Sequence, residues 1–73
     1  MEFKVKTLTI GGPAGDRTFL YLKGVNKKDG CDIFKNECGL KEIKNSYCKL
    51  AFYDIDIDTL YRWSNLFKVW IIE

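Results

Sequence analysis

Histidine is absent from the 73-residue chain, which removes the side chain that most often serves as a general base or metal ligand near neutral pH. Serine occurs only at Ser46 and Ser64, and neither lies in the Gly-x-Ser-x-Gly turn that exposes the nucleophile of many hydrolases. The sequence therefore predicts no catalytic residue and no enzymatic activity. We also expect no bound cofactor.

Cysteine is scarce, and occurs only at Cys31, Cys38 and Cys48. Structural zinc sites take four ligands in closely spaced pairs, whereas these thiols are widely separated and one ligand is missing. A zinc site completed by Glu37 as the fourth ligand is the alternative to three cysteines with a purely structural role. We favour the structural role and predict no metal site. The alternating pattern around Cys48 places it in the core. An odd number of cysteines argues against a disulfide framework and suits a cytoplasmic protein.

Long apolar runs are also missing, since none approaches the roughly 20 residues that a membrane-spanning helix requires. Residues 1–6 lack the apolar core of a secretion signal, so we expect a cytoplasmic protein without membrane association. Apolar residues supply 47% of the chain and charged residues 30%, a balance typical of a folded domain. A chain this short has room for one core, so residues 1–73 should form a single domain.

The first half of the chain predicts two strands joined by a hairpin connection. The single proline and three of the six glycines lie within 11–16, between the alternating segments 2–10 and 17–25. The alternation reverses at Leu8, which predicts a bulge or a strand buried on both faces at its far end. The polar segment 26–30 predicts a second turn.

The second half predicts two more strands and one or two short helices. Residues 47–55 and 67–72 alternate as strands. Between them, Asp58 suits the N-cap of a short helix that packs Trp63 against the sheet. Apolar positions in 31–46 fit a helix, interrupted by a glycine, better than a strand.

These elements predict an α+β fold, with an antiparallel sheet of about four strands and one or two short helices. The alternative is a five-stranded SH3-like barrel. The segment 31–46 decides between them, because a strand over residues 31–37 favours the barrel and a helix favours the open sheet.

The strand alternation assigns side chains to two faces of the sheet. One face carries the expected core, with Leu60 and Trp63 above it: Phe3, Val5, Leu20, Leu22, Leu50, Phe52, Val69 and Ile71. The other face carries cations and aromatics, Lys4 and Lys6 among them, and its candidate binding residues are Arg17, Phe19, Tyr21, Lys23, Lys49, Tyr53, Lys68 and Trp70.

Aromatic and arginine side chains of this kind anchor protein interfaces, and they also stack on bases and contact phosphates. The lysines and aromatics of this face also have an explanation without a partner. Lysines on an outer face are ordinarily solvated, and the aromatics form a second core if the segment 31–46 covers this face. Residues 1–30, 31–53 and 54–73 carry net charges of +3, +1 and −2, and a total of +2 is weak for a nucleic-acid binder. A protein partner is therefore the leading expectation.

The predicted function is that of a small cytoplasmic, non-catalytic protein that acts by protein–protein interaction, as an inhibitor or adaptor. The lysine, isoleucine, asparagine and aspartate bias suits an AT-rich microbial or phage genome, and hence a host protein as the target. The alternative is a nucleic-acid-binding module that uses the basic aromatic face. Alanine at Tyr21 or Trp70 is expected to weaken binding without unfolding the chain.

An aspartate triplet, Asp54, Asp56 and Asp58, falls on one side of an extended chain. An EF-hand loop beginning at Asp54 would need glycine at its sixth position and glutamate at its twelfth, where Thr59 and Asn65 stand. That type of calcium site is excluded. The triplet is expected to form a strand exit and helix cap, or an acidic patch for a basic partner surface.

Overall fold

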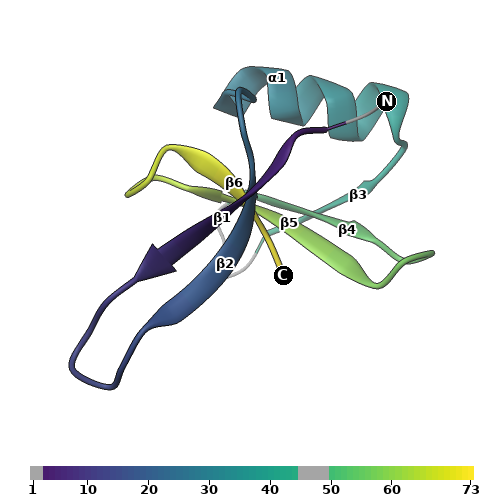
Figure 1. Ribbon diagram of the computed structural model, residues 1–73. Helices are drawn as coiled ribbons and strands as arrows, with labels where there is room; N and C mark the ends of the chain where they lie inside the picture. The colour runs from purple at the N-terminus through teal and green to yellow at the C-terminus, as the bar shows by residue number, and fades with distance from the viewer. Residues whose placement is uncertain (1–2, 45–49) are drawn as a thin grey trace.

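The computed structural model describes residues 3–44 and 50–73 (Figure 1). Its elements are, in order, β1 (Val5–Ile10), β2 (Arg17–Leu22), α1 (Lys27–Asp32), a π-helical continuation (Ile33–Glu37), β3 (Lys41–Ile43), β4 (Ala51–Asp54), β5 (Thr59–Ser64) and β6 (Val69–Ile72). The strands form one antiparallel sheet in the order β1-β2-β6-β5-β4-β3. The last strand therefore lies in the interior of the sheet.

The helix begins where a turn was predicted, so the assignment of 26–30 to a turn was wrong. The Asn26 side chain accepts a hydrogen bond from the Asp29 amide at 2.7 Å, which makes Asn26 the N-cap of α1. Gly39 has a φ of +63° and directly follows the helix, so the chain turns back there towards β3. The predicted glycine interruption of the 31–46 segment is thus the end of the helix.

The core forms where the helical segment packs against one face of the sheet. Phe34 stacks on Tyr61 at 4.7 Å between ring centroids and meets Trp70 edge-on at 5.1 Å. Phe52 lies 5.4 Å from Phe34, and Leu22 completes the buried cluster. These contacts place α1 and its continuation over the face that carries Leu22, Phe52 and Trp70. We call this the covered face, and the other side the open face.

The sheet contains six strands among the described residues, two more than predicted, partly because residues 59–64 form β5 instead of a helix. β5 pairs with both β4 and β6, and Asp58, with a φ of +48°, belongs to the turn before it. Leu60 and Trp63 are spaced as on one side of a helix, but Tyr61 and Trp63 also alternate with Leu60 and Arg62 as in a strand. Pairing with β4 on one side and β6 on the other selected the strand.

The faces of β6 are the reverse of those predicted. Trp70 pairs with Leu22 and Trp63 on the covered face and is 0% exposed, so its assignment to the binding face was wrong. Ile71 lies on the open face yet is only 2% exposed. Because β6 is an interior strand, its apolar side chains are buried on both sides, and alternation carried no information about its orientation.

The predicted bulge in the first strand is absent from the described structure, since β1 pairs with β2 without interruption from Val5 to Ile10. The barrel alternative is not confirmed: residues 31–37 are helical, and the strand order has two ends, β1 and β3.

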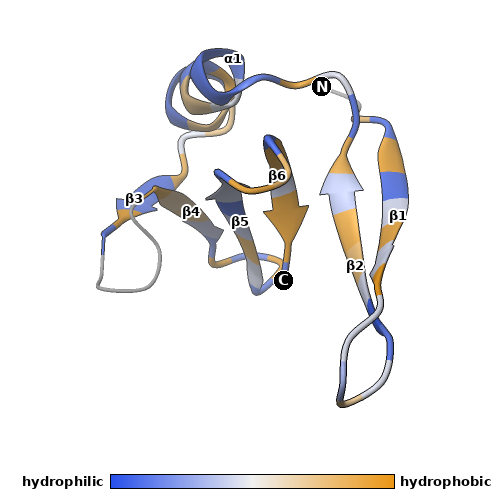
Figure 2. Ribbon diagram, turned by 90° about the vertical axis from the view of Figure 1, so that its left-hand side faces the viewer, coloured by the Kyte–Doolittle hydropathy of each residue, from blue (hydrophilic) through white to orange (hydrophobic). Residues whose placement is uncertain are grey.

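A hairpin arm extends from one end of the sheet. Only Leu20–Leu22 of β2 pairs with β6, so the remaining β1–β2 ribbon and its turn, residues 8–19, lack a second neighbour on the β2 side. We call these residues the hairpin arm. The tip of the arm points away from α1 (Figures 1 and 2). No helix in the described ranges is long and apolar enough to cross a membrane.

Candidate binding face

The open face is assembled from all six strands by their register. One row of directly opposed residues runs across it in the order Lys6, Tyr21, Ile71, Arg62, Ala51 and Ile43. Opposed residues share a face and contact one another, so this row brings together side chains that are up to 65 positions apart in the chain. Its centre holds Arg62 beside Ile71 and Ala51, which are only 2% and 0% exposed, and its β1–β2 side is aromatic and cationic.

The β2 strand supplies the aromatic part of the open face. Phe19 and Tyr21 are half-buried and lie opposite Leu8 and Lys6 of β1. The Arg17 guanidinium stands over the Phe19 ring at 5.3 Å from its centroid, a distance typical of a cation–π contact. Arginine and two aromatic rings therefore form one continuous stripe along β2.

The tip of the hairpin arm continues this stripe as a shallow hollow of about 400 Å³. It is lined by Ile10, Arg17, Phe19 and the turn residues from Gly11 to Gly15. Gly15 adopts a φ of +106°, a conformation that side-chain-bearing residues rarely take, which is why glycine serves this turn. A small apolar cavity next to a cation is thus presented at the far end of the arm.

The centre of the open face also holds an ion pair. Arg62 Nε lies 3.1 Å from Glu73 Oε1, and both side chains are partly exposed. Glu73 is held in place because its backbone forms reciprocal hydrogen bonds with Leu60. This pair neutralises the cation at the middle of the face. The other cations that the register places on this face are Lys6 and Arg17 at the β1–β2 side and Lys41 at the β3 side.

The predicted binding residues are only partly brought together. Arg17, Phe19, Tyr21 and Tyr53 lie on the open face. Lys23 is exposed just beyond β2, where its amide donates to the Lys4 carbonyl at 2.8 Å. Lys68 is exposed in the β5–β6 turn, Lys49 lies outside the described residues, and Trp70 is in the core. Leu60 was predicted in the core above the sheet, whereas it pairs with Tyr53 on the open face. Arg62 was not predicted as a binding residue, although the alternation over 59–64 was a signal for it.

The aspartate triplet forms a turn between β4 and β5 instead of capping a helix. Asp54 Oδ1 accepts a hydrogen bond from the Asp56 amide at 3.1 Å, and Asp58 accepts one from the Tyr53 hydroxyl. Within residues 3–44 and 50–73, no group of three histidine, cysteine or acidic side chains is placed to hold a metal ion. The geometry of the triplet is accounted for by the turn.

The Tyr53–Asp58 contact makes a prediction about pH. The hydrogen bond to Asp58 raises the pKa of Tyr53, with smaller contributions from burial and from the charges of Asp58 and Asp54. Stability from this contact is therefore present below the ordinary tyrosine pKa of about 10 and is lost as the pH rises through the raised folded value. Replacing Asp58 by glycine, which tolerates the positive φ at this position, should lower the midpoint of Tyr53.

Residue-specific NMR of the Tyr53 ring carbon measures that midpoint. The readout must be specific because burial also raises the pKa of Tyr61. An unchanged Tyr53 midpoint in Asp58→Gly would show that the hydrogen bond is not formed in solution.

The two described cysteines give no sign of a reactive thiol. Cys31 is half-buried in α1, and burial raises its pKa, which disfavours the nucleophilic thiolate. Cys38 is exposed at the end of the helical segment. The predicted core position of Cys48 lies outside the described residues.

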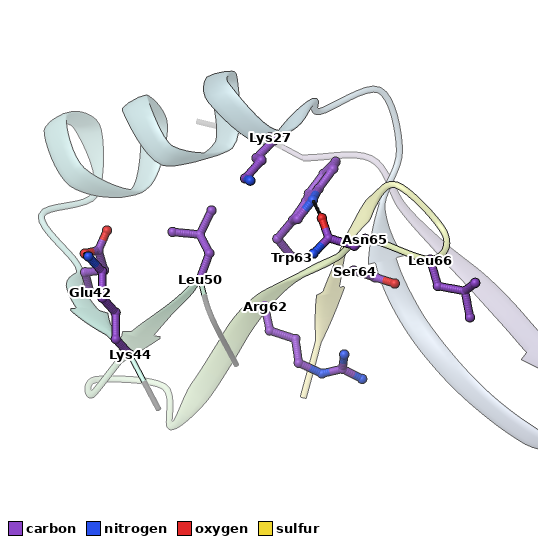
Figure 3. Close-up of a pocket in the computed structure, with 9 residues that line it drawn as sticks. All are labelled: Lys27, Glu42, Lys44, Leu50, Arg62, Trp63, Ser64, Asn65 and Leu66. Atoms are coloured by element: carbon purple, nitrogen blue, oxygen red, sulfur yellow. Dashed lines mark hydrogen bonds and ion pairs between the residues drawn. The ribbon is translucent and has the colours of Figure 1, made fainter. Parts of the chain in front are cut away.

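A second hollow, of about 530 Å³, lies between α1 and the β5–β6 turn (Figure 3). Lys27, Lys44 and Arg62 contribute to its lining, but Lys44 pairs with Glu42 at 3.6 Å and Arg62 with Glu73. The Arg62 side chain also points away from Lys27 in Figure 3. Because the cations do not converge, this hollow does not form an anion site.

The open face, with its hairpin arm, is therefore the strongest candidate for a functional surface on the described chain. Neither the family models, nor the curated proteins, nor the solved structures with which the chain was compared match it.

Proposed function

We propose that this chain is a small non-catalytic binding module that holds another protein on its open face, as a cytoplasmic inhibitor or adaptor does. The observation that carries the proposal is that, among the described residues, the helical segment packs on one face of the sheet only. Phe34 and its helix pack on the covered face, while Phe19 and Tyr21 remain accessible beside Arg17 on the other. Tyrosine and arginine are enriched among residues that dominate interface energies.

The hairpin arm supports the proposal because its open-face side carries apolar groups without a covering layer in the described structure. Leu8 and Phe19 lie on this side and are only half-buried. A two-stranded ribbon is marginally stable in water by itself, and contact with a partner on the open face would bury these two side chains.

The charge of the open face indicates the kind of partner surface. Lys6, Arg17 and Lys41 lie on it, and Lys4 and Lys23 are exposed beside it. A partner surface that offers apolar groups to Phe19 and Tyr21, with acidic groups around them, complements this arrangement. A phage-encoded protein with a host target is compatible with this proposal.

A nucleic-acid-binding module is the second candidate, favoured by the stripe of Arg17, Phe19 and Tyr21 along one strand, which has the residue types that stack on bases. The pairing of Arg62 with Glu73 counts against it, because that cation is neutralised at the centre of the face. The net charge of +2 also offers few phosphate contacts.

Affinity capture from a host lysate, split into nuclease-treated and untreated halves, separates the two candidates. The proposal expects a stoichiometric protein in both halves. Nucleic acid alone in the untreated half would favour the second candidate and contradict the first.

Replacing Tyr21 by alanine should weaken binding of the captured protein by about 2 kcal/mol, or roughly thirtyfold in Kd. The expected effect is large because Tyr21 lies in the central row of the open face, between Lys6 and Ile71. Thr18→Ala is the matched control, since Thr18 is an exposed residue of the same strand on its other side. Calorimetric titration measures both, and equal affinities for Tyr21→Ala and wild type would contradict the proposal.

A further inference from the structure

We propose that β1 is a dimerisation edge, along which two copies of the chain pair antiparallel, β1 to β1, about a two-fold axis at Thr7. The two sheets then become one continuous sheet across both copies. This inference does not rest on the proposed function, because it concerns the edge of the sheet and not the open face.

The backbone of β1 presents a row of outward-pointing groups. The Lys23 amide donates to the Lys4 carbonyl, so Lys4 and Lys23 form a hydrogen-bonded pair in the β1–β2 register. Such pairs alternate along an antiparallel ladder, so the even-numbered residues of β1 point their N–H and C=O groups towards β2. The groups of Val5, Thr7 and Thr9 point away from β2, to the side where the strand order ends.

An independent observation agrees with this assignment. The hydroxyl oxygens of Thr9 and Thr18 lie 3.3 Å apart across the two strands. Side chains approach most closely at the pairs that do not exchange backbone hydrogen bonds. Thr9 is therefore at such a position, and its own backbone groups face outward.

The edge lacks the features that usually prevent strand pairing. β1 contains no proline, is six residues long and has no bulge, whereas the opposite edge strand β3 has only three residues. Lys6, the one charge inside β1, lies on the open face. A lysine blocks an edge when pairing would bury it, and here its ammonium group stays in water after two copies join.

Charge and parity together select one register. The outward residues must pair with one another, which places the two-fold axis at a residue and keeps the open faces of both copies on the same side. An axis at Lys6 would set two lysines directly opposite each other. An axis at Leu8 would leave Val5, whose backbone groups point outward, opposite a residue beyond β1. With the axis at Thr7, Val5 lies opposite Thr9, and Lys6 lies opposite Leu8.

This pairing also accounts for an exposed apolar side chain and for the arm. Val5, 48% exposed, gains Thr9 of the second copy as a cross-strand neighbour. The ribbon of each hairpin arm becomes part of a four-stranded layer instead of an isolated two-stranded one, which is the more stable arrangement.

Thr7→Pro tests the edge directly. Proline removes an amide that points outward, so it costs no hydrogen bond within one chain, and edge strands tolerate proline at such positions. Light scattering after size exclusion, over a range of concentrations, should find wild type and the control Thr7→Val as dimers and Thr7→Pro as a monomer. Circular dichroism should show the same folded spectrum for all three.

A pair of charge variants tests the register and does not depend on how Thr7→Pro folds. Leu8→Lys should raise the dimer dissociation constant at least tenfold, because it sets a lysine opposite Lys6 of the second copy. Adding Lys6→Glu should restore dimerisation, since opposite charges then face each other.

A wild type that stays monomeric at millimolar concentration, or a dimer that Thr7→Pro leaves intact, would overturn the proposal. If wild type is itself monomeric and Thr7→Pro loses the captured protein, the edge pairs with a partner's strand and the dimer proposal is overturned.

Discussion

Replacing Trp70 by alanine is expected to destabilise the domain by about 3–5 kcal/mol, which is comparable to the whole stability of a fold this small. Trp70 is 0% exposed and packs against Phe34, Phe52 and Trp63. Its indole Nε1 also donates to the Asn26 carbonyl at 3.0 Å. The substitution would leave a large cavity and would remove the hydrogen bond that ties the helix start to the sheet.

Urea denaturation followed by circular dichroism measures this effect. Trp70→Phe is the matched variant, because it keeps an aromatic ring but has no donor for the Asn26 carbonyl, and it should lose less stability than alanine. A Trp70→Ala protein with wild-type stability would return Trp70 to the surface position that the alternation of β6 predicted.

Replacing Gly30 by alanine should also destabilise the fold strongly, by about 2–4 kcal/mol, although alanine is the better helix former. Gly30 is a buried residue of α1, and a Cβ atom there would overlap the indole ring of Trp70. The ring cannot move aside, because it is fully buried. The overlap therefore outweighs the gain of about 1 kcal/mol in helix propensity.

Thermal unfolding provides the measurement, and a loss of this size should lower Tm by roughly 10 °C or more. Lys28→Ala is the matched control, because Lys28 is an exposed residue of the same helix and alanine there tests propensity without contact. Lys28→Ala should not lower Tm, because the side chain at that position is exposed. A Gly30→Ala protein whose Tm was also not lowered would show that α1 does not approach Trp70 closely.

The first hairpin was predictable because two independent local signals agreed. Residues of β1 and β2 alternate, and the connection between them concentrates glycine with the only proline. Arg17, Phe19 and Tyr21 were placed on one face for the same reason. This part of the candidate site required no knowledge of the rest of the chain.

The second half was harder because its patterns fit two structures. Leu60 and Trp63 fit a helical stripe, while Tyr61 and Trp63 fit one face of a strand, and pairing with β4 and β6 selected the strand. Likewise Asn26 suits both a turn and a helix cap, and its hydrogen bond to Asp29 belongs to the cap. Tertiary contacts that are distant in sequence decided both cases.

The open face was only partly predictable because it depends on the order of the strands. Arg62 and Ile71 become neighbours of Tyr21 only because β6 inserts between β2 and β5. An interior strand with apolar residues on both sides does not reveal which side faces the helix. The orientation of β6, and with it the location of Trp70, therefore required the fold.

The most direct test of the central claim, that the open face holds a protein partner, is hydroxyl-radical footprinting of the chain with and without the captured protein. Phe19, Tyr21 and Tyr53 should be protected in the complex. Ile55 and Leu66, which are 78% and 82% exposed in the turns of the sheet, should be labelled equally in both states. Protection of Ile55 or Leu66, with unchanged labelling of Phe19 and Tyr21, would contradict the claim.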